Sequence, residues 1–192
     1  MPGLARIRVA LRDRLRALAG DCRGLAAVEF AMLLPLLVTL YLGGVEVSQA
    51  VAIERKVSMS ARVIADLVAR GTTISDAEMT TILSAAKTVV APYPDSNIKV
   101  VVSSIKIDKN GNATVDWSDA TANATKLGAG TSVTVPDGLK QANAESYVIW
   151  ATASYDFKPT IGYVITGTLT LSDATYMGPR TQNRICRVNP CS

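Results

Sequence analysis

An uninterrupted apolar run near the N-terminus constrains this chain more than any other feature. Residues 25–45 read LAAVEFAMLLPLLVTLYLGGV and contain one charged side chain, that of Glu29. As a helix, about 21 residues rising 1.5 Å each can cross a hydrocarbon core of roughly 30 Å. We therefore expect a transmembrane helix over residues 25–47.

The charges on either side of this run predict its orientation. Residues 1–24 hold six arginines and two aspartates, whereas the rest of the chain holds equal numbers of basic and acidic residues. Basic residues are retained on the cytoplasmic side of a membrane. We therefore expect residues 1–24 to form a basic cytoplasmic leader and the chain after residue 47 to lie outside the cytoplasm. A basic flank of this kind does not indicate a nucleic-acid partner.

A cleaved secretory signal peptide is the alternative interpretation of the same run. The apolar region of a signal peptide normally spans about 7 to 15 residues, and this run is longer. The sequence Ser48-Gln49-Ala50 nevertheless offers a small-x-small cleavage site, which would release a chain that begins at Val51.

Beyond the membrane segment, the apolar residues keep a helical spacing. They recur as Val47, Ala50, Val51, Val57, Ala61, Ile64, Ala65 and Val68. This pattern predicts that the helix continues over residues 48–70 as an amphipathic, extracytoplasmic extension and ends at Gly71. A second helix should follow, because Ser75 and Glu78 form a capping-box pattern ahead of an apolar periodicity that Pro92 ends.

The period then changes to that of strands. Apolar residues alternate at 98–102 and 105–107 with a break at Ser103-Ser104, and Asn110-Gly111 predicts a hairpin turn into 113–117. Two further strands are indicated at 147–157 and 165–171, and residues 118–145 predict a long loop with a short strand at 133–135. The expected fold of residues 71–192 is an extracytoplasmic α+β domain, an antiparallel sheet of about four strands packed on the long helix.

The three cysteines are unequally placed. Cys22 precedes the apolar run, while Cys186 and Cys191 lie close together at the C-terminus. In an oxidising compartment the latter two are natural disulfide partners. Two unpaired cysteines are the alternative. Metal binding is not expected, because the chain has no histidine and no further cysteine pair.

A lone carboxylate inside an apolar helix requires an explanation. Burying Glu29 in a membrane costs on the order of a few kcal/mol, so such a residue usually has a partner or a task. Alternatively, Glu29 lies near the helix start, where its side chain can reach the membrane interface and benefit from the helix dipole.

The residues around Glu29 carry a family resemblance. Gly24, followed by four residues and then Glu29-Phe30, resembles the processing site of type IV pilin-like proteins. The stretch RGLAAVEFAMLLPLL resembles the TadE/TadG-like proteins of tight-adherence (Flp) pilus assembly, with TadE-like the closer match by size. The resemblance covers mainly residues 23–70. It implies a pilin-like fold and cleavage between Gly24 and Leu25 by a prepilin peptidase, an aspartate protease of the inner membrane.

From this resemblance we expect a pseudopilin or minor pilin of the bacterial inner membrane, with a periplasmic C-terminal domain and with incorporation into a pilus as one outcome. The implied partners are the prepilin peptidase, other pilins or pseudopilins, and the Tad assembly platform, with Glu29 and Phe30 as assembly residues. The alternative is an uncleaved scaffold or binding protein of the same machinery. No enzyme activity, cofactor, metal or small-molecule substrate is expected, because no nucleophile and base occur at a recognisable spacing.

Overall fold

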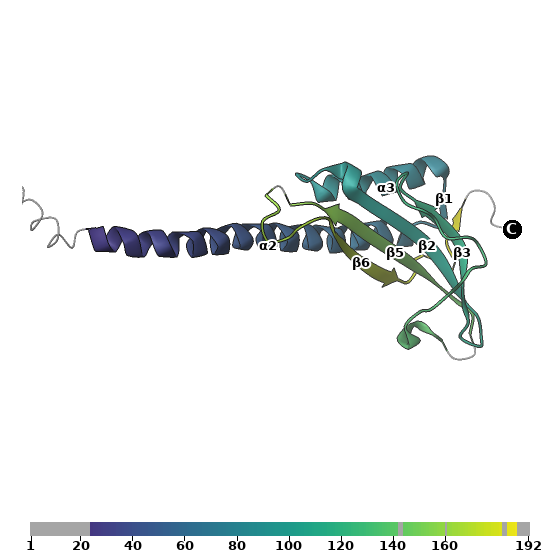
Figure 1. Cartoon of the computed structure of the whole chain (residues 1–192). Coiled ribbons are helices and arrows are strands. Elements are labelled where there is room, and N and C mark those ends of the chain that lie inside the picture. The colour runs from purple at the N-terminus through teal and green to yellow at the C-terminus, as the bar shows by residue number, and fades with distance from the viewer. Residues whose placement is uncertain (1–23, 142–143, 160, 182–183, 188–192) are drawn as a thin grey trace, which may run out of the picture. The chain divides into compact units, whose positions relative to one another are not determined.

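The computed structural model describes residues 24–141, 144–159, 161–181 and 184–187 (Figure 1). The chain divides into two compact units, residues 1–45 and residues 46–192. One helix, α2 (Leu25–Ala69), belongs to both units and confirms the long helix predicted from the sequence. The end at Ala69 lies next to the predicted stop, where the Gly71 amide donates to the Val68 carbonyl.

The second part of α2 forms one wall of the domain core. Its buried side chains follow the helical spacing, and they are Ala50, Ile53, Val57, Ala61, Ile64, Ala65 and Val68. The amphipathic continuation predicted for residues 48–70 is thereby confirmed as a helix whose apolar face is covered by the domain.

Helix α3 (Asp76–Val90) begins at the predicted capping box. The Glu78 amide donates to Ser75 Oγ, and the Ser75 amide donates to a carboxylate oxygen of Glu78 at 2.7 Å. These two hydrogen bonds satisfy two backbone donors that the first turn of a helix otherwise leaves open. Burial of Met79, Leu83, Ala86 and Val90 directs one face of α3 into the core that α2 also lines.

The sheet has five strands in the order β4-β3-β2-β5-β6, and every neighbouring pair is antiparallel. The strands are β2 (Ile98–Ile107), β3 (Ala113–Ala120), β4 (Ser132–Val133), β5 (Ser146–Phe157) and β6 (Leu169–Met177). A separate parallel pair joins β1 (Thr73–Ile74) to β7 (Cys186–Arg187), and no sequence pattern predicts this pair. The α+β class and the antiparallel sheet are confirmed.

The break at Ser103-Ser104 marks a change of face rather than an interruption of the strand. In β2, Ile98, Val100 and Val102 face the core shared with the helices, whereas Ile105 and Ile107 belong to a second core. Leu127, Val133, Val135 and Leu139 of the segment after β3 cover this second core. The pairing with β3 shifts between Ser104 and Ile105, so β3 carries the extra residue of a bulge.

The turn between β2 and β3 confirms the predicted hairpin. Gly111 has a φ of 82°, in the left-handed region that glycine adopts readily. The Asp108 carboxylate accepts from the amides of Asn110 and Asn112, each at 2.8 Å. The Asn112 side-chain amide also donates to this carboxylate and is the main reason that the pKa of Asp108 lies below its usual value, with the backbone amides adding to the shift.

The strand predicted at 165–171 is wrong at its start, because β6 begins only at Leu169. Ile165 cannot join the sheet, since its amide already donates to the Glu46 carboxylate. Gly167 follows with a φ of 90°, which does not continue a strand. The loop predicted for residues 118–145 also begins later than expected, because β3 extends to Ala120.

Candidate functional site

The residues predicted for processing and assembly lie at the start of α2. Gly24 precedes the helix, and a Cβ placed on it would meet no atom within 4 Å. Leu25 and Phe30 are 61% and 58% exposed, and Glu29 is exposed as well. The described residues leave the Gly24–Leu25 peptide bond uncovered, and cleavage there stays a prediction. The leader, residues 1–23, lies outside the described residues.

The first part of α2 is apolar and has no cover within the described chain. Every side chain from residue 24 to residue 38 is exposed, including those of Met32, Leu33 and Leu37. The helix is long and apolar enough to cross a membrane. Large apolar side chains without cover indicate a binding or membrane surface. This surface can make apolar contacts with lipid or with other apolar helices.

The sequence did not reveal the role of Glu46, which follows directly on the apolar run. Its side chain is 1% exposed and accepts three backbone hydrogen bonds, from the amides of Tyr163, Val164 and Ile165, at 2.8, 3.0 and 2.8 Å. A buried carboxylate needs such donors, because an unpaired charge is costly away from water. Glu46 thereby fixes the segment between β5 and β6 against α2. In the sequence, the one sign of this role is that a charged residue, Glu46, directly follows Val45 at the end of the apolar run.

The C-terminal segment is tied to the domain by two arginines that flank Cys186. Arg184 makes a paired contact with the Asp116 carboxylate at 2.9 and 3.0 Å. Arg187 donates to the carbonyl oxygens of Ile74 and Ser75, both at 2.8 Å, and pairs with Asp119. Cys186 is therefore held in register with Thr73 in the β1–β7 pair. Cys191 lies outside the described residues, so its pairing with Cys186 stays a prediction.

Asp119 is a partly buried carboxylate that pairs with Arg187 in this cluster. Burial raises its pKa, and the nearby charge of Arg187 opposes that shift. Arg187 and Asp119 form one network with Asp76, whose carboxylate lies 2.5 Å from the Arg187 guanidinium. In addition, the Trp117 indole donates to the Ile185 carbonyl at 2.7 Å. These groups all serve to hold the C-terminal segment in place, since each contact joins it to a helix or strand of the domain.

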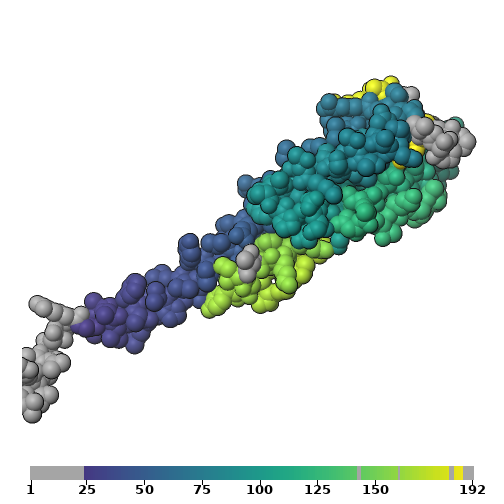
Figure 2. All heavy atoms as spheres, turned by 90° about the horizontal axis from the view of Figure 1, so that it is seen from above, coloured from purple at the N-terminus to yellow at the C-terminus, as the bar shows by residue number. Residues whose placement is uncertain are grey.

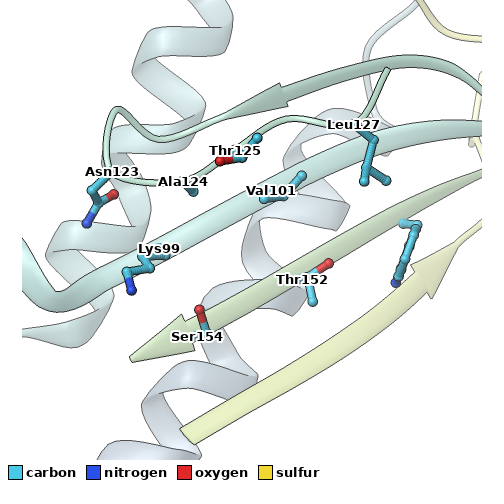
Figure 3. A pocket seen from close by; sticks show the side chains of 9 residues that line it. Lys99, Val101, Asn123, Ala124, Thr125, Leu127, Thr152 and Ser154 are labelled. Carbon is cyan, nitrogen blue, oxygen red and sulfur yellow. The ribbon is translucent and has the colours of Figure 1, made fainter. Parts of the chain in front are cut away.

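A shallow hollow of about 400 Å³ lies on the outer face of β2 and β5 (Figure 3). Lys99, Asn123 and Trp150 are among the residues that line it. Lys99 pairs with Asp156 at 2.6 Å, and the Asn123 side chain donates to the carbonyl oxygens of Ser96 and Ile98. Its most polar side chains are thus already bound within the chain. Among the described residues, no three His, Cys, Asp or Glu side chains are grouped to hold a metal ion.

Residues 24–66 match the family model of the TadE-like protein. The matched segment contains Gly24, Glu29 and Glu46 and covers most of α2. The resemblance inferred from the residues is confirmed for this segment, while residues 67–192 lie outside the match. No curated protein and no solved structure matches the chain.

Proposed function

We propose that this protein is a pseudopilin or minor pilin of a Tad (Flp) pilus, anchored in the bacterial inner membrane by the first part of α2. The TadE-like segment and the apolar helix fit a membrane protein associated with the Tad pilus. The proposal rests mainly on the overlap of these two features. The family match, residues 24–66, contains the whole exposed part of the helix, residues 25–38. In this proposal the N-terminus faces the cytoplasm and residues 46–192 are periplasmic.

The proposed maturation step is cleavage of the Gly24–Leu25 bond by a prepilin peptidase. A protease needs extended, accessible backbone at the bond it cuts, and glycine places no side chain in the way. The exposure of Leu25 and the open space around Gly24 support this step. Cleavage removes the basic leader and creates a new amino group at Leu25.

Assembly would then rest on charge neutralisation inside an apolar environment. The new Leu25 amine is a cation, and the Glu29 carboxylate is an anion that the described chain leaves exposed. Each charge is costly in lipid when it is unpaired, so the amine of one subunit and Glu29 of a neighbour stabilise each other. Phe30 and the apolar side chains beyond it pack against neighbouring pilin helices. The pair of charges sets the axial register.

An uncleaved scaffold of the same machinery is the second candidate. The amphipathic part of α2 is consistent with both candidates, because the domain covers that part in either case. The two candidates differ in the mature N-terminus and in their presence within the fibre. In the scaffold, Glu29 is an interfacial carboxylate and no Leu25 amine exists.

N-terminal sequencing of the protein extracted from membranes tests the proposal. A pseudopilin begins at Leu25, an uncut scaffold begins at Met1 or Pro2, and a secreted protein begins at Val51. The variant Gly24→Leu should retain the leader, because the bulkier side chain obstructs the cleavage site. Gly44→Leu is the matched control, since a Cβ on Gly44 also meets nothing within 4 Å. A wild-type protein that keeps its leader in pilus-producing cells would contradict the pseudopilin role.

A further inference from the structure

The segment between β5 and β6 exposes an unusual group of apolar side chains. Three large apolar side chains lie within four residues of each other and are about half exposed: Ile161 (51%), Tyr163 (57%) and Val164 (50%). Two of them, Tyr163 and Val164, contribute the backbone amides that bind Glu46. The backbone of this segment is therefore fixed, while the side chains of Ile161, Tyr163 and Val164 stay about half exposed. We call residues 161–165 the Glu46 loop.

The position of the Glu46 loop along the chain relates it to the membrane. Residues 25–45 rise about 30 Å as a helix, which equals the thickness of a hydrocarbon core. Glu46 is the next residue, and the loop is hydrogen-bonded directly to its carboxylate. Figures 1 and 2 both show the yellow-green segment ahead of β6 beside the blue part of α2. If residues 25–45 span the hydrocarbon core, Glu46 lies at the level where the chain leaves the lipid, and the loop is bound to this residue.

The composition of the loop suits that level. Tyrosine is enriched at membrane–water interfaces because its ring is apolar and its hydroxyl can remain hydrated. Ile161 and Val164 supply apolar area on the same segment, and the exposed Lys158 lies just before it in the sequence. The Glu46 carboxylate does not itself face the membrane surface, since it is buried and bound by three backbone amides.

We propose that the Glu46 loop is a second membrane contact, which inserts Ile161, Tyr163 and Val164 into the interfacial layer of the bilayer. This inference rests on the proposed membrane anchor. The ligand is the lipid interface itself, and α2 supplies the anchoring while the loop fixes how the domain stands on the membrane. Glu46 is a positioning residue, since it shapes the loop without contacting lipid.

Photocrosslinking in reconstituted vesicles tests this contact. The full chain, carrying a benzophenone amino acid at one position, is reconstituted into phosphatidylethanolamine–phosphatidylglycerol vesicles, and lipid adducts are measured by mass spectrometry. The probe replaces Leu33, Tyr163 or Met59. Met59 is 57% exposed, as Tyr163 is, but it lies about 20 Å beyond Glu46 along the helix. The headgroup layer is only about 5 to 8 Å thick, so Met59 should stay outside it.

The proposal predicts lipid adducts at Leu33 and at Tyr163, with about tenfold fewer at Met59. Adducts at Leu33 combined with a Tyr163 yield no higher than that of Met59 would overturn the loop contact and leave the anchor intact. Protein adducts in place of lipid adducts at Tyr163 would overturn it as well, because they identify a subunit interface. Absence of adducts at Leu33 would overturn the membrane anchor and the loop contact together.

The role of Glu46 has a separate readout. In Glu46→Ala the loop loses its three hydrogen bonds, and lipid adducts at Tyr163 should fall about threefold while those at Leu33 stay unchanged. Glu54→Ala is the control, since Glu54 is an exposed glutamate of the same helix. An unchanged yield at Tyr163 in Glu46→Ala would remove Glu46 from the proposal.

Discussion

The two parts of α2 are equally helical but have opposite environments. In residues 25–38 every side chain is exposed, whereas Ile53, Val57 and Ile64 of the second part are at most 1% exposed. Apolar character alone does not distinguish them, because both parts are rich in aliphatic residues. The second part packs against α3 and the sheet, while no described residue covers the first part. One helix thus combines an apolar part that is exposed with an apolar part that is buried in the domain.

The largest expected effect is a stability difference between matched aliphatic truncations. Ile64→Ala removes a fully buried side chain and should lower the free energy of unfolding by about 2 to 5 kcal/mol. Leu33→Ala truncates a side chain that is 54% exposed and should change it by about 0.5 kcal/mol or less. Urea unfolding of the full chain in detergent micelles, followed by Trp117 and Trp150 fluorescence, measures both. Equal losses would show that the first part also belongs to the folded domain.

A smaller effect should distinguish the two faces of the second part. Lys56 Nζ donates to the carbonyl oxygens of Val89 and Ala91, at 3.1 and 2.6 Å, where α3 ends. Lys56→Ala leaves these end carbonyls without that donor and should cost about 1 kcal/mol of unfolding free energy. Arg55→Ala is the control on the exposed face, where about 0.5 kcal/mol or less is expected. A larger loss in Arg55→Ala would contradict the assignment of faces.

The sheet should add a pH dependence to the stability of the domain. The Lys99 ammonium and the Thr170 hydroxyl donate to Asp156 and lower its pKa below the usual value. A lowered folded-state pKa gives stability that is complete above the unfolded-state pKa and is lost as pH falls through the folded-state value. Asp156→Asn should therefore be less stable than wild type near neutral pH, with a difference that shrinks on acidification. A constant difference down to pH values below the carboxylate range would refute this linkage.

The smallest change in domain stability is expected for Glu29→Ala, which should nevertheless impair association. Glu29 is exposed within the described chain, so its loss should alter the unfolding free energy by about 0.5 kcal/mol or less. Co-purification with the major pilin should fall, because the Leu25 amine of a neighbour loses its partner charge. Immunoblots of membrane fractions should show unchanged insertion and cleavage. Normal co-purification and normal piliation would favour the uncleaved scaffold.

The local signals in the sequence predicted most of the fold. The capping box at Ser75 and Glu78, the turn at Gly111 and the alternation through β5 depend on neighbouring residues, and each was found where expected. The break at Ser103-Ser104 was visible but its cause was not. A change of buried face depends on what covers each side of the sheet, and here the covering residues lie far along the chain, as Leu127 and Val135 do.

Long-range polar contacts account for the rest of what the sequence did not predict. Glu46 binds amides more than a hundred residues away, and the β1–β7 pair joins Thr73 to Cys186. Backbone amides have no sequence signature, so the partner of a buried carboxylate cannot be deduced from residue types. The same contact explains why β6 begins after Ile165: the alternation of apolar residues with threonines predicts Ile165 as part of the strand, but its amide donates to Glu46.

Alkaline carbonate extraction of membranes from cells that express the full chain tests the central claim most directly. This treatment releases proteins held at the surface by charge or by protein contacts, and it leaves a helix inserted in lipid in place. If residues 25–45 cross the bilayer, the protein should stay in the membrane pellet and dissolve only when detergent is added. Release of the intact protein into the carbonate supernatant would contradict the membrane anchor.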